Sequence, residues 1–364
     1  MEFDKLKFFC SLPWLGLAVS PNGRLHCCCM TTMYEIGNLN KGNLLNQYNS
    51  DYFKKIRLQM LNNEIPRECY SCTNGEKTGG YSLRYHKNNA LRKYYKDIEE
   101  MTNINTGEVS KLLIKDTDIR PSNLCNFRCQ MCSSSVSRGH EIARGAKTKD
   151  CEELIMKEVT PLLDTIDTYH FAGGEPFLMK STYEVMDHYL KTNNKNVHIS
   201  FSTNLSVIRY KDICITEYLK KFKNVILNVS IDGYGKICEE QRVGCNFENL
   251  VNNLLVVRKA CPNIQINSHT VVTTINCEWI PEYMEWVIGF KYSNGMFNKS
   301  VVNKCSFNCL TNPIRLNIQG LDNGTKLRIK DKYLEFMNKY KGTKVDGFSI
   351  DGVLNYIIKN MRVG

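Results

Sequence analysis

The sequence lacks three features that would each indicate a particular class of protein. It has no run of the roughly 18 apolar residues that a membrane helix needs. It begins MEFDKLKFF, where a secretion signal would carry an uninterrupted apolar segment. It also has no long basic run, because 48 lysines and arginines are scattered among 37 aspartates and glutamates. We therefore expect a cytoplasmic protein without a membrane span, whose net charge of +11 belongs to a solvated surface. An anionic substrate or acidic peptide is the alternative use of that charge.

Cysteine, in contrast, is abundant. The chain has 17 cysteines in 364 residues, and without a secretion signal a disulfide framework does not explain them. The seven histidines show no ligand spacing. Since hydrophobic residues make up 42% and charged residues 23%, the chain has ordinary globular composition. Metal ligation by thiolates is the best explanation of the cysteine content.

From about Lys111, short β-rich runs alternate with segments of helical length. Strands are predicted at 112–119, 168–172, 197–203, 225–231 and 264–272, with a sixth within 296–304. Helices are predicted at 152–165, 180–192, 211–222, 247–260 and 279–289. This alternation predicts an α/β fold with a parallel sheet. Six units over about 200 residues suit a partial barrel better than a closed one of about 250 residues.

The remaining segments define the expected domain organisation. Residues 1–80 show little periodicity and hold six cysteines, which indicates a small domain organised around metal. Residues 81–110 are expected to form a connector, helical at first and packed against a neighbour. Residues 111–310 form the barrel. Residues 311–364 end in DKYLEFMNKYK and DGVLNYIIKNM, which predict two amphipathic helices.

The motif CNFRCQMC at 125–132 places three cysteines in one loop directly after the first predicted barrel strand. In a parallel β/α architecture, such loops face the active site. Three thiolates can hold a [4Fe–4S] cluster while leaving one iron without a protein ligand, and zinc is the alternative metal. Further along, AGGEP (172–176) follows the second strand, and NVSIDG (228–233) ends the fourth. Two glycines let the backbone approach a ligand closely, and a carboxylate beside them can accept from an ammonium group.

Together these motifs resemble the radical S-adenosylmethionine (SAM) superfamily. The resemblance implies a partial (β/α)6 barrel and a [4Fe–4S] cluster held by Cys125, Cys129 and Cys132. The free iron of that cluster would bind SAM, whose reductive cleavage gives a 5′-deoxyadenosyl radical. The positions that match the superfamily's SAM contacts are Met131, Gly173, Gly174, Glu175, Thr203, Asn204, Ser230, Asp232, Arg242 and Asn276. Within this set, Glu175 matches the motif for the methionine amino group, Asp232 a ribose contact and Arg242 a partner of the SAM carboxylate.

The N-terminal cysteines resemble a twitch or SPASM-type auxiliary-cluster domain, here placed before the barrel, although such domains usually follow it. A full SPASM domain uses seven cysteines for two clusters, whereas this segment offers about four positions. The resemblance therefore implies one auxiliary iron–sulfur cluster, with structural zinc as the alternative. Its expected ligands are Cys10, Cys28, Cys69 and Cys72, with Cys27 or Cys29 possible in place of Cys28.

The resemblance indicates the class of reaction more specifically than it indicates the substrate. We expect hydrogen abstraction from a peptide or protein, leading to a crosslink, an oxidation or an epimerisation, with an external electron donor of the flavodoxin or ferredoxin type. A sugar, nucleoside or amino acid is the alternative substrate. A non-catalytic zinc or iron–sulfur module that binds nucleic acid would give no role to AGGEP or NVSIDG. Cys305 and Cys309 are either buried thiols, cluster ligands or hydrogen donors, and His170 is a candidate pocket residue.

Overall fold

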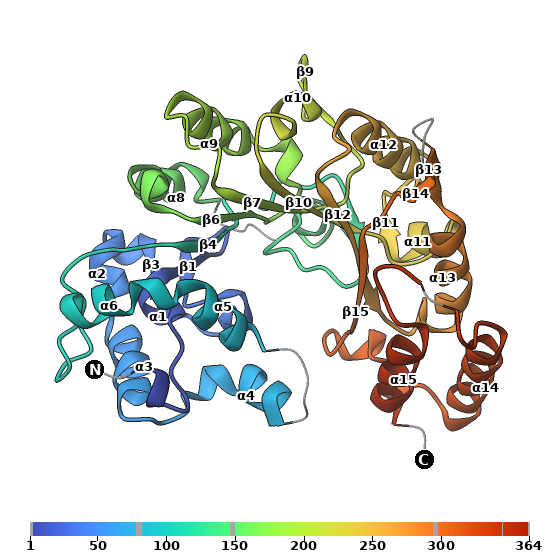
Figure 1. The fold of residues 1–364 in the computed structure, drawn as a ribbon, viewed down its shortest axis with the longest axis horizontal. Helices are drawn as coiled ribbons and strands as arrows, with labels where there is room; N and C mark the ends of the chain where they lie inside the picture. Colours follow the sequence, from blue (N-terminus) through green and yellow to red (C-terminus); the bar gives the residue numbers. More distant parts are fainter. Residues whose placement is uncertain (1–2, 78–81, 146–149, 294–297, 344, 363–364) are drawn as a thin grey trace. The chain divides into compact units, whose positions relative to one another are not determined.

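The computed structural model describes residues 3–77, 82–145, 150–293, 298–343 and 345–362. Within these ranges it is a mixed α/β structure with parallel strands at its core, as predicted (Figure 1). The chain divides into two compact units, which are described separately below. The first consists of Met1–Asn123, Thr148–Gly174 and Met179–Ile199, and the second of Leu124–Lys147, Glu175–Leu178 and Ser200–Gly364.

The first unit contains strands in the order β6-β4-β1-β2-β3. They are β1 (Gly16–Val19), β2 (Arg24–His26), β3 (Gly37–Asn38), β4 (Asp116–Ile119) and β6 (Thr168–Phe171). Strand β4 is parallel to both β1 and β6, whereas β1, β2 and β3 pair antiparallel. The cysteine-rich segment thus adds three strands, β1, β2 and β3, to the sheet, which the sequence did not reveal. All four residues of β1 are buried, so GLAV lacks the polar alternation that marks a strand.

Helices cover this sheet and form the rest of the first unit. They are α1 (Leu12–Leu15), α2 (Leu44–Tyr48), α3 (Asp51–Leu61), α4 (Tyr70–Lys77), α5 (Leu83–Leu91), α6 (Tyr95–Met101), α8 (Glu152–Val159) and α9 (Lys180–Lys191). Ser50 caps α3 by accepting from the Phe53 amide, and the helix buries Phe53, Ile56 and Met60 on one face. Helices α8 and α9 occupy the first two predicted crossovers.

The second unit contains strands in the order β15-β12-β10-β7. They are β7 (His198–Thr203, whose first two residues belong to the first unit), β10 (Asn224–Ser230), β12 (Gln265–Val272) and β15 (Lys304–Cys309). Strand β12 runs parallel to β10 and to β15. Buried and half-buried residues alternate along β10 and β12, which is the period-2 pattern used to predict them.

Two predicted boundaries in this unit are wrong. The sixth strand begins at residue 304, where the predicted stretch ends, because Asn303 anchors the chain to Ile266 through its backbone and side chain just before β15. Upstream, β13 (Lys291–Ser293) and β14 (Asn298–Ser300) form an antiparallel hairpin, and 296–297 lie outside the described residues. The predicted helix 211–222 is reduced to α10 (Thr216–Leu219), which follows the hairpin of β8 (Arg209–Tyr210) and β9 (Ile213–Cys214).

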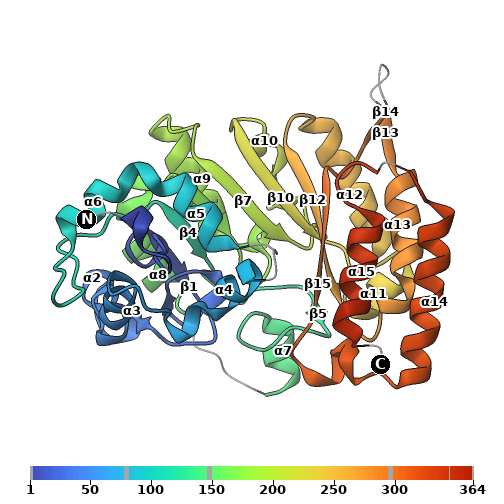
Figure 2. The same cartoon turned by 60° about the horizontal axis from the view of Figure 1, so that its bottom comes forward.

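The remaining elements of the second unit surround its sheet. They are the two-residue strands β5 (Arg128–Cys129) and β11 (Arg242–Val243) and the helices α7 (Arg138–Ala143), α11 (Lys236–Gln241), α12 (Phe247–Ala260), α13 (Ile280–Gly289), α14 (Asn323–Lys339) and α15 (Ile350–Met361). The predicted C-terminal helices α14 and α15 contact each other and lie side by side in both views (Figures 1 and 2). Nowhere in the described ranges is a helix long and apolar enough to cross a membrane.

Candidate metal centres and active site

The cysteine loop at 125–132 belongs to the second unit and is held by backbone hydrogen bonds. Strand β5 pairs antiparallel with β11, so that Cys129 lies opposite Arg242. The amide of Cys132 donates to the Cys129 carbonyl at 2.9 Å, which closes a turn between these two cysteines. His140 bonds the same carbonyl through Nε2 at 2.8 Å. The backbone between Cys129 and Cys132 is therefore fixed independently of any metal.

The three thiols of this loop form a soft donor set. Burial raises the pKa of Cys125 to about 12. A hydrogen bond between Cys129 and Cys132, together with burial, raises the pKa of Cys129, and the same bond lowers that of Cys132. Among the described residues, no three ligand-type side chains surround a point that suits a single ion. Thiolates are the ligands of iron–sulfur clusters, so the donor chemistry fits one, and loading would release protons.

Arg242 and Asp232, two of the predicted SAM contacts, pair with each other behind this loop. Arg242 Nε lies 2.7 Å from Asp232 Oδ2, and both side chains are buried. Arg242 Nη1 also donates to Cys129 Sγ at 3.8 Å. The second carboxylate oxygen of Asp232 accepts from the Val271 amide at 2.7 Å. A buried guanidinium with this partner supplies a fixed positive charge beside the cysteine loop.

Asn276, predicted as a late SAM contact, is also fully buried. Its Nδ2 donates to the carbonyls of Asp232 and Val271, at 2.7 and 2.8 Å, and its Oδ1 accepts from the Thr273 amide at 2.7 Å. All three bonds are to backbone atoms. Asn276 therefore positions the segment that carries Asp232.

Glu175 and the end of β7 form a second buried polar group in this unit. The Glu175 carboxylate is fully buried and accepts from Thr203 Oγ1 at 2.6 Å, the Asn204 amide at 2.7 Å and the Phe177 amide at 3.2 Å. Burial raises the pKa of Glu175 to about 7, against the opposing effect of these three bonds. Asn204 Nδ2 in turn lies 3.9 Å from Cys125 Sγ. These contacts make Glu175 a positioning residue for the strand end that adjoins Cys125.

The two glycines that precede Glu175 belong to the first unit. Gly173 has φ +117°, and a Cβ there would lie 2.8 Å from the Ser122 carbonyl oxygen. The Gly174 amide donates to that same oxygen at 3.1 Å. Only glycine fits this approach without strain. The backbone thus requires glycine at position 173.

The other predicted contacts are partly accessible. Met131 and Ser230 are both half-buried. His170 is half-buried on β6, opposite Asp118 of β4. Cys305 and Cys309 are half-buried on β15, and burial raises the pKa of each to about 12.

The auxiliary-cluster candidates come together around one cavity in the first unit. Cys10, Cys28, Cys69 and Cys72 all line it, whereas Cys27 and Cys29 do not. Burial is the main cause that raises the pKa of Cys10, Cys28 and Cys69. Four thiols from three separate segments thus surround one space. Thiolates are the ligands of iron–sulfur clusters, whereas the described side chains are not placed to hold a single ion such as zinc. The structure favours Cys28 among the three adjacent cysteines.

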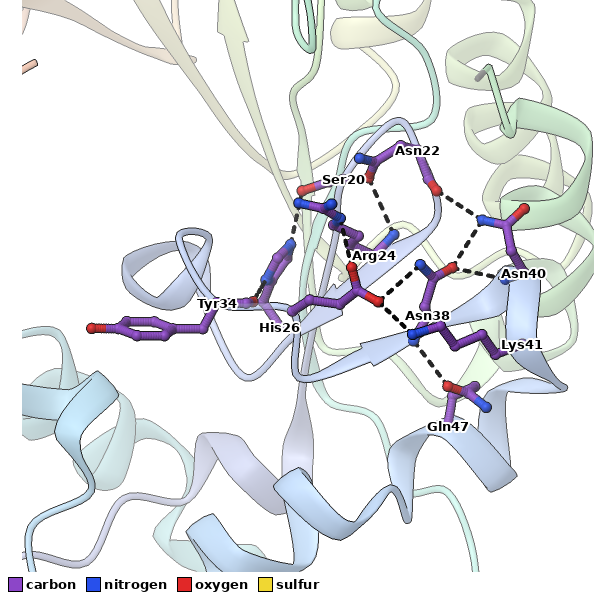
Figure 3. A network of polar contacts seen from close by, with 10 residues as sticks. Ser20, Asn22, Arg24, His26, Tyr34, Asn38, Asn40, Lys41 and Gln47 are labelled. Atoms are coloured by element: carbon purple, nitrogen blue, oxygen red, sulfur yellow. Dashed lines mark hydrogen bonds and ion pairs between the residues drawn. The ribbon is translucent and has the colours of Figure 1, made fainter. Parts of the chain in front are cut away.

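A network of polar side chains holds the strands that lead into this cavity (Figure 3). His26, at the end of β2, contacts Ser20 Oγ through Nε2 and the Tyr34 carbonyl through Nδ1, both at 2.8 Å. A carbonyl can only accept, so Nδ1 carries the proton and Nε2 accepts from Ser20. The network also includes Asn22, Arg24, Glu35, Asn38, Asn40, Lys41 and Gln47. It fixes the backbone just before Cys28.

Two residues of α5 hold the other side of the cavity, and the sequence analysis missed them. Asn88 donates to the Phe9 carbonyl at 2.9 Å and accepts from the Ser11 amide at 2.8 Å, so it bonds the residues on both sides of Cys10. Arg84, one helical turn earlier, also bonds the Phe9 carbonyl and lines the cavity. In the sequence, the only indication of a shared role was that Arg84 and Asn88 are four residues apart and so lie on one face of a helix. Polar residues at this spacing occur on any solvated helix face, so the spacing does not indicate a metal site.

Two segments of the chain match models of known protein families. Residues 119–287 match the model described as "Radical SAM superfamily", and residues 10–73 match "Iron-sulfur cluster-binding domain" (SPASM). The chain thus carries a segment that matches the radical SAM superfamily, with a segment that matches the SPASM domain on its N-terminal side. The first match implies SAM and a [4Fe–4S] cluster, and the second implies auxiliary iron–sulfur binding. The parallel-strand core is consistent with the partial barrel of this superfamily.

Partial similarity to solved structures was also found. One is "Native anSMEcpe with bound AdoMet", with 18% identity and a TM-score of 0.44; the match covers 66% of this chain and 65% of that one. Another is Streptococcus suis SuiB bound to the precursor peptide SuiA, with 14% identity and a TM-score of 0.44, over 82% of this chain and 67% of that one. The chain thus spans slightly less than two thirds of the first of these proteins. No curated protein matches it.

Proposed function

We propose that this protein is a radical SAM enzyme that modifies a peptide or protein by crosslinking, oxidation or epimerisation. The observation that carries the proposal is the loop of Cys125, Cys129 and Cys132, which offers three thiols and lies in a segment that matches the superfamily. Three thiolates would hold a [4Fe–4S] cluster and leave one iron for SAM. When bound there, the reduced cluster and SAM supply a 5′-deoxyadenosyl radical that removes hydrogen from a substrate carbon.

The chain's own residues would orient this chemistry. The antiparallel pairing of β5 with β11 fixes Cys129, and Arg242 places a positive charge 3.8 Å from its sulfur. Glu175 holds Thr203 and Asn204 at the end of β7. Gly173 and Gly174, which precede Glu175 in the first unit, are proposed as SAM contacts from their motif. In the second unit Met131, Ser230, Asp232, Arg242 and Asn276 are further proposed contacts, and Asn276 holds the segment that carries Asp232.

The cavity of Cys10, Cys28, Cys69 and Cys72 is proposed to hold a single auxiliary cluster. Four thiolates complete the coordination of a cluster, so no iron is left for a substrate. We therefore assign this centre to electron transfer, which suits a net two-electron oxidation. An external donor of the flavodoxin or ferredoxin type would reduce the SAM-cleaving cluster.

The substrate assignment rests on the SPASM match, because enzymes with such domains often mature peptides. A cytoplasmic location is proposed from the thiols, because no disulfide is recorded among the 17 cysteines, all of which lie within the described ranges. Domain boundaries at about 80, 110 and 310 are part of the same proposal.

Anaerobic reconstitution followed by SAM and dithionite tests the reaction class. We expect 5′-deoxyadenosine from the wild type and none from the Cys129→Ala variant, while Cys69→Ala still produces it. The matched pair separates the two centres, because each variant removes one thiol from one of them. If the wild type, with iron bound, releases no 5′-deoxyadenosine, the proposal is wrong. Mass spectrometry of peptides and metabolites from the same incubation then separates a peptide from a small-molecule substrate.

A further inference from the structure

Arg84 lies at the wall of the auxiliary cavity, in a segment to which the sequence assigned no chemistry. It is on the first turn of α5, and its side chain is only 11% exposed. Among the described residues that line the cavity, Arg84 and Glu68 are the charged ones. A guanidinium stays protonated at any working pH, so Arg84 brings a permanent positive charge to this wall.

The guanidinium of Arg84 joins two of the cysteine-bearing segments. Its Nη1 donates to the carbonyls of Lys7 and Phe9 at 2.8 and 2.9 Å, just before Cys10. On its other side, Nε donates to Glu76 Oε1 at 3.0 Å, and Nη2 pairs with the second carboxylate oxygen. Glu76 lies on α4, one turn beyond Cys72. The planar fork of arginine thus spans the space between the Cys10 segment and the Cys72 helix.

Two neighbours fix the fork in this position. Ser82 caps α5 and also donates to Glu76. Asn88, one turn after Arg84, bonds both sides of Cys10. Because Glu76 neutralises part of the guanidinium's charge, the pair presents a positive end to the cavity and a negative end away from it.

The geometry points to Arg84 as a positioning residue that closes the four-cysteine cavity and, through its charge, sets the reduction potential of the auxiliary centre. This inference rests on the proposed function, since it requires a cluster there. The reduced form of a cluster carries one more negative charge than the oxidised form, so a nearby cation favours reduction. Removing that cation lowers the potential. Removing Glu76, which opposes it, raises the potential.

The test uses the full-length chain with Cys125, Cys129 and Cys132 all replaced by alanine, so that only the auxiliary centre binds iron. In this background Arg84→Gln, Arg84→Lys and Glu76→Gln are compared by iron content and by redox titration followed with electron paramagnetic resonance. We expect Arg84→Gln to lower the potential by about 59 mV, a tenfold change in a one-electron equilibrium. Glu76→Gln should raise it, and Arg84→Lys should keep the potential but reduce iron content, because lysine keeps the charge without the fork.

Arg92→Gln is the matched control, because Arg92 pairs with Asp4 at the exposed surface and does not line the cavity. If Arg84 has a purely structural role, Arg84→Gln and Glu76→Gln should shift the reduction potential in the same direction. That result overturns the electrostatic part of the inference. If Arg84→Gln behaves like Arg92→Gln, the whole inference is wrong. If the background protein itself binds no cluster, the auxiliary-cluster part of the proposed function fails instead. Should Arg84→Gln not fold, Glu76→Gln and Arg84→Lys still decide the question.

Discussion

The two groups of cysteines are built in different ways. In the second unit, three thiols come from eight consecutive residues, and paired backbone strands hold them. In the first unit, four thiols come from three segments up to 62 positions apart in the numbering, and side chains such as Arg84, Asn88 and His26 hold those segments. The proposed three-thiol centre can therefore be read from local spacing. The proposed four-thiol centre of this protein depends on tertiary contacts between separate segments.

The largest expected effect separates the three adjacent cysteines of the first unit. Cys28→Ala removes a thiol that lines the cavity, whereas Cys27→Ala and Cys29→Ala do not. We therefore expect only Cys28→Ala to lose the auxiliary centre, a loss of about four irons per chain if it is a [4Fe–4S] cluster. Iron and sulfide analysis of the reconstituted variants measures this. Loss of iron from Cys27→Ala or Cys29→Ala with retention in Cys28→Ala would assign the ligand to a different cysteine.

The next prediction compares a buried ion pair of the second unit with an exposed one of the first. Asp232→Asn leaves the buried Arg242 without its counter-charge, which should cost about 4 kcal/mol of unfolding free energy. Asp4→Asn breaks the exposed pair with Arg92 and should cost less than about 1 kcal/mol. Urea unfolding of both cluster-free variants gives the two values. Equal losses would show that burial of Arg242 does not persist in solution.

The pH dependence of stability tests the buried carboxyl of Glu175. Its pKa is about 7 in the fold and 4.5 unperturbed, so folding favours the protonated form. Protonated Glu175 therefore contributes to the free energy of unfolding in full below pH 4.5. This contribution, on the order of 3 kcal/mol, is lost as pH rises through 7. Glu175→Gln should remove this slope while lowering stability at low pH. Parallel pH profiles for the cluster-free wild type and variant would contradict this assignment.

The smallest effect concerns the glycine turn of the first unit. Gly173→Ala places a methyl group 2.8 Å from the Ser122 carbonyl oxygen at positive φ, which should cost about 2 kcal/mol. Gly320→Ala is the matched control, because its Cβ would meet no atom within 4 Å. Thermal unfolding of the two variants gives the difference. An unchanged melting temperature for Gly173→Ala would mean that this turn relaxes.

Sequence reasoning succeeded where a pattern is local. The strands β7, β10 and β12 were placed within one residue at each end, because alternating burial is visible in HISFST, NVILNVS and QINSHTVV. It failed for β1, which is buried throughout, and for β15, whose start depends on the distant Ile266. The positive φ of Gly173 could be inferred from its motif, whereas the pairing of Arg242 with Asp232 could not.

The order of the cysteines and glycines along the chain was enough by itself to indicate the superfamily whose model matches residues 119–287, since ligand spacing within one loop does not depend on the rest of the fold. Only the tertiary structure places Cys28, rather than Cys27 or Cys29, in the lining of the first unit's cavity and brings Arg84 to the same cavity. Both outcomes depend on segments far apart in sequence meeting in space. The side-chain hydrogen bonds that hold such segments together join residues at no fixed separation in the sequence, so the sequence does not predict them.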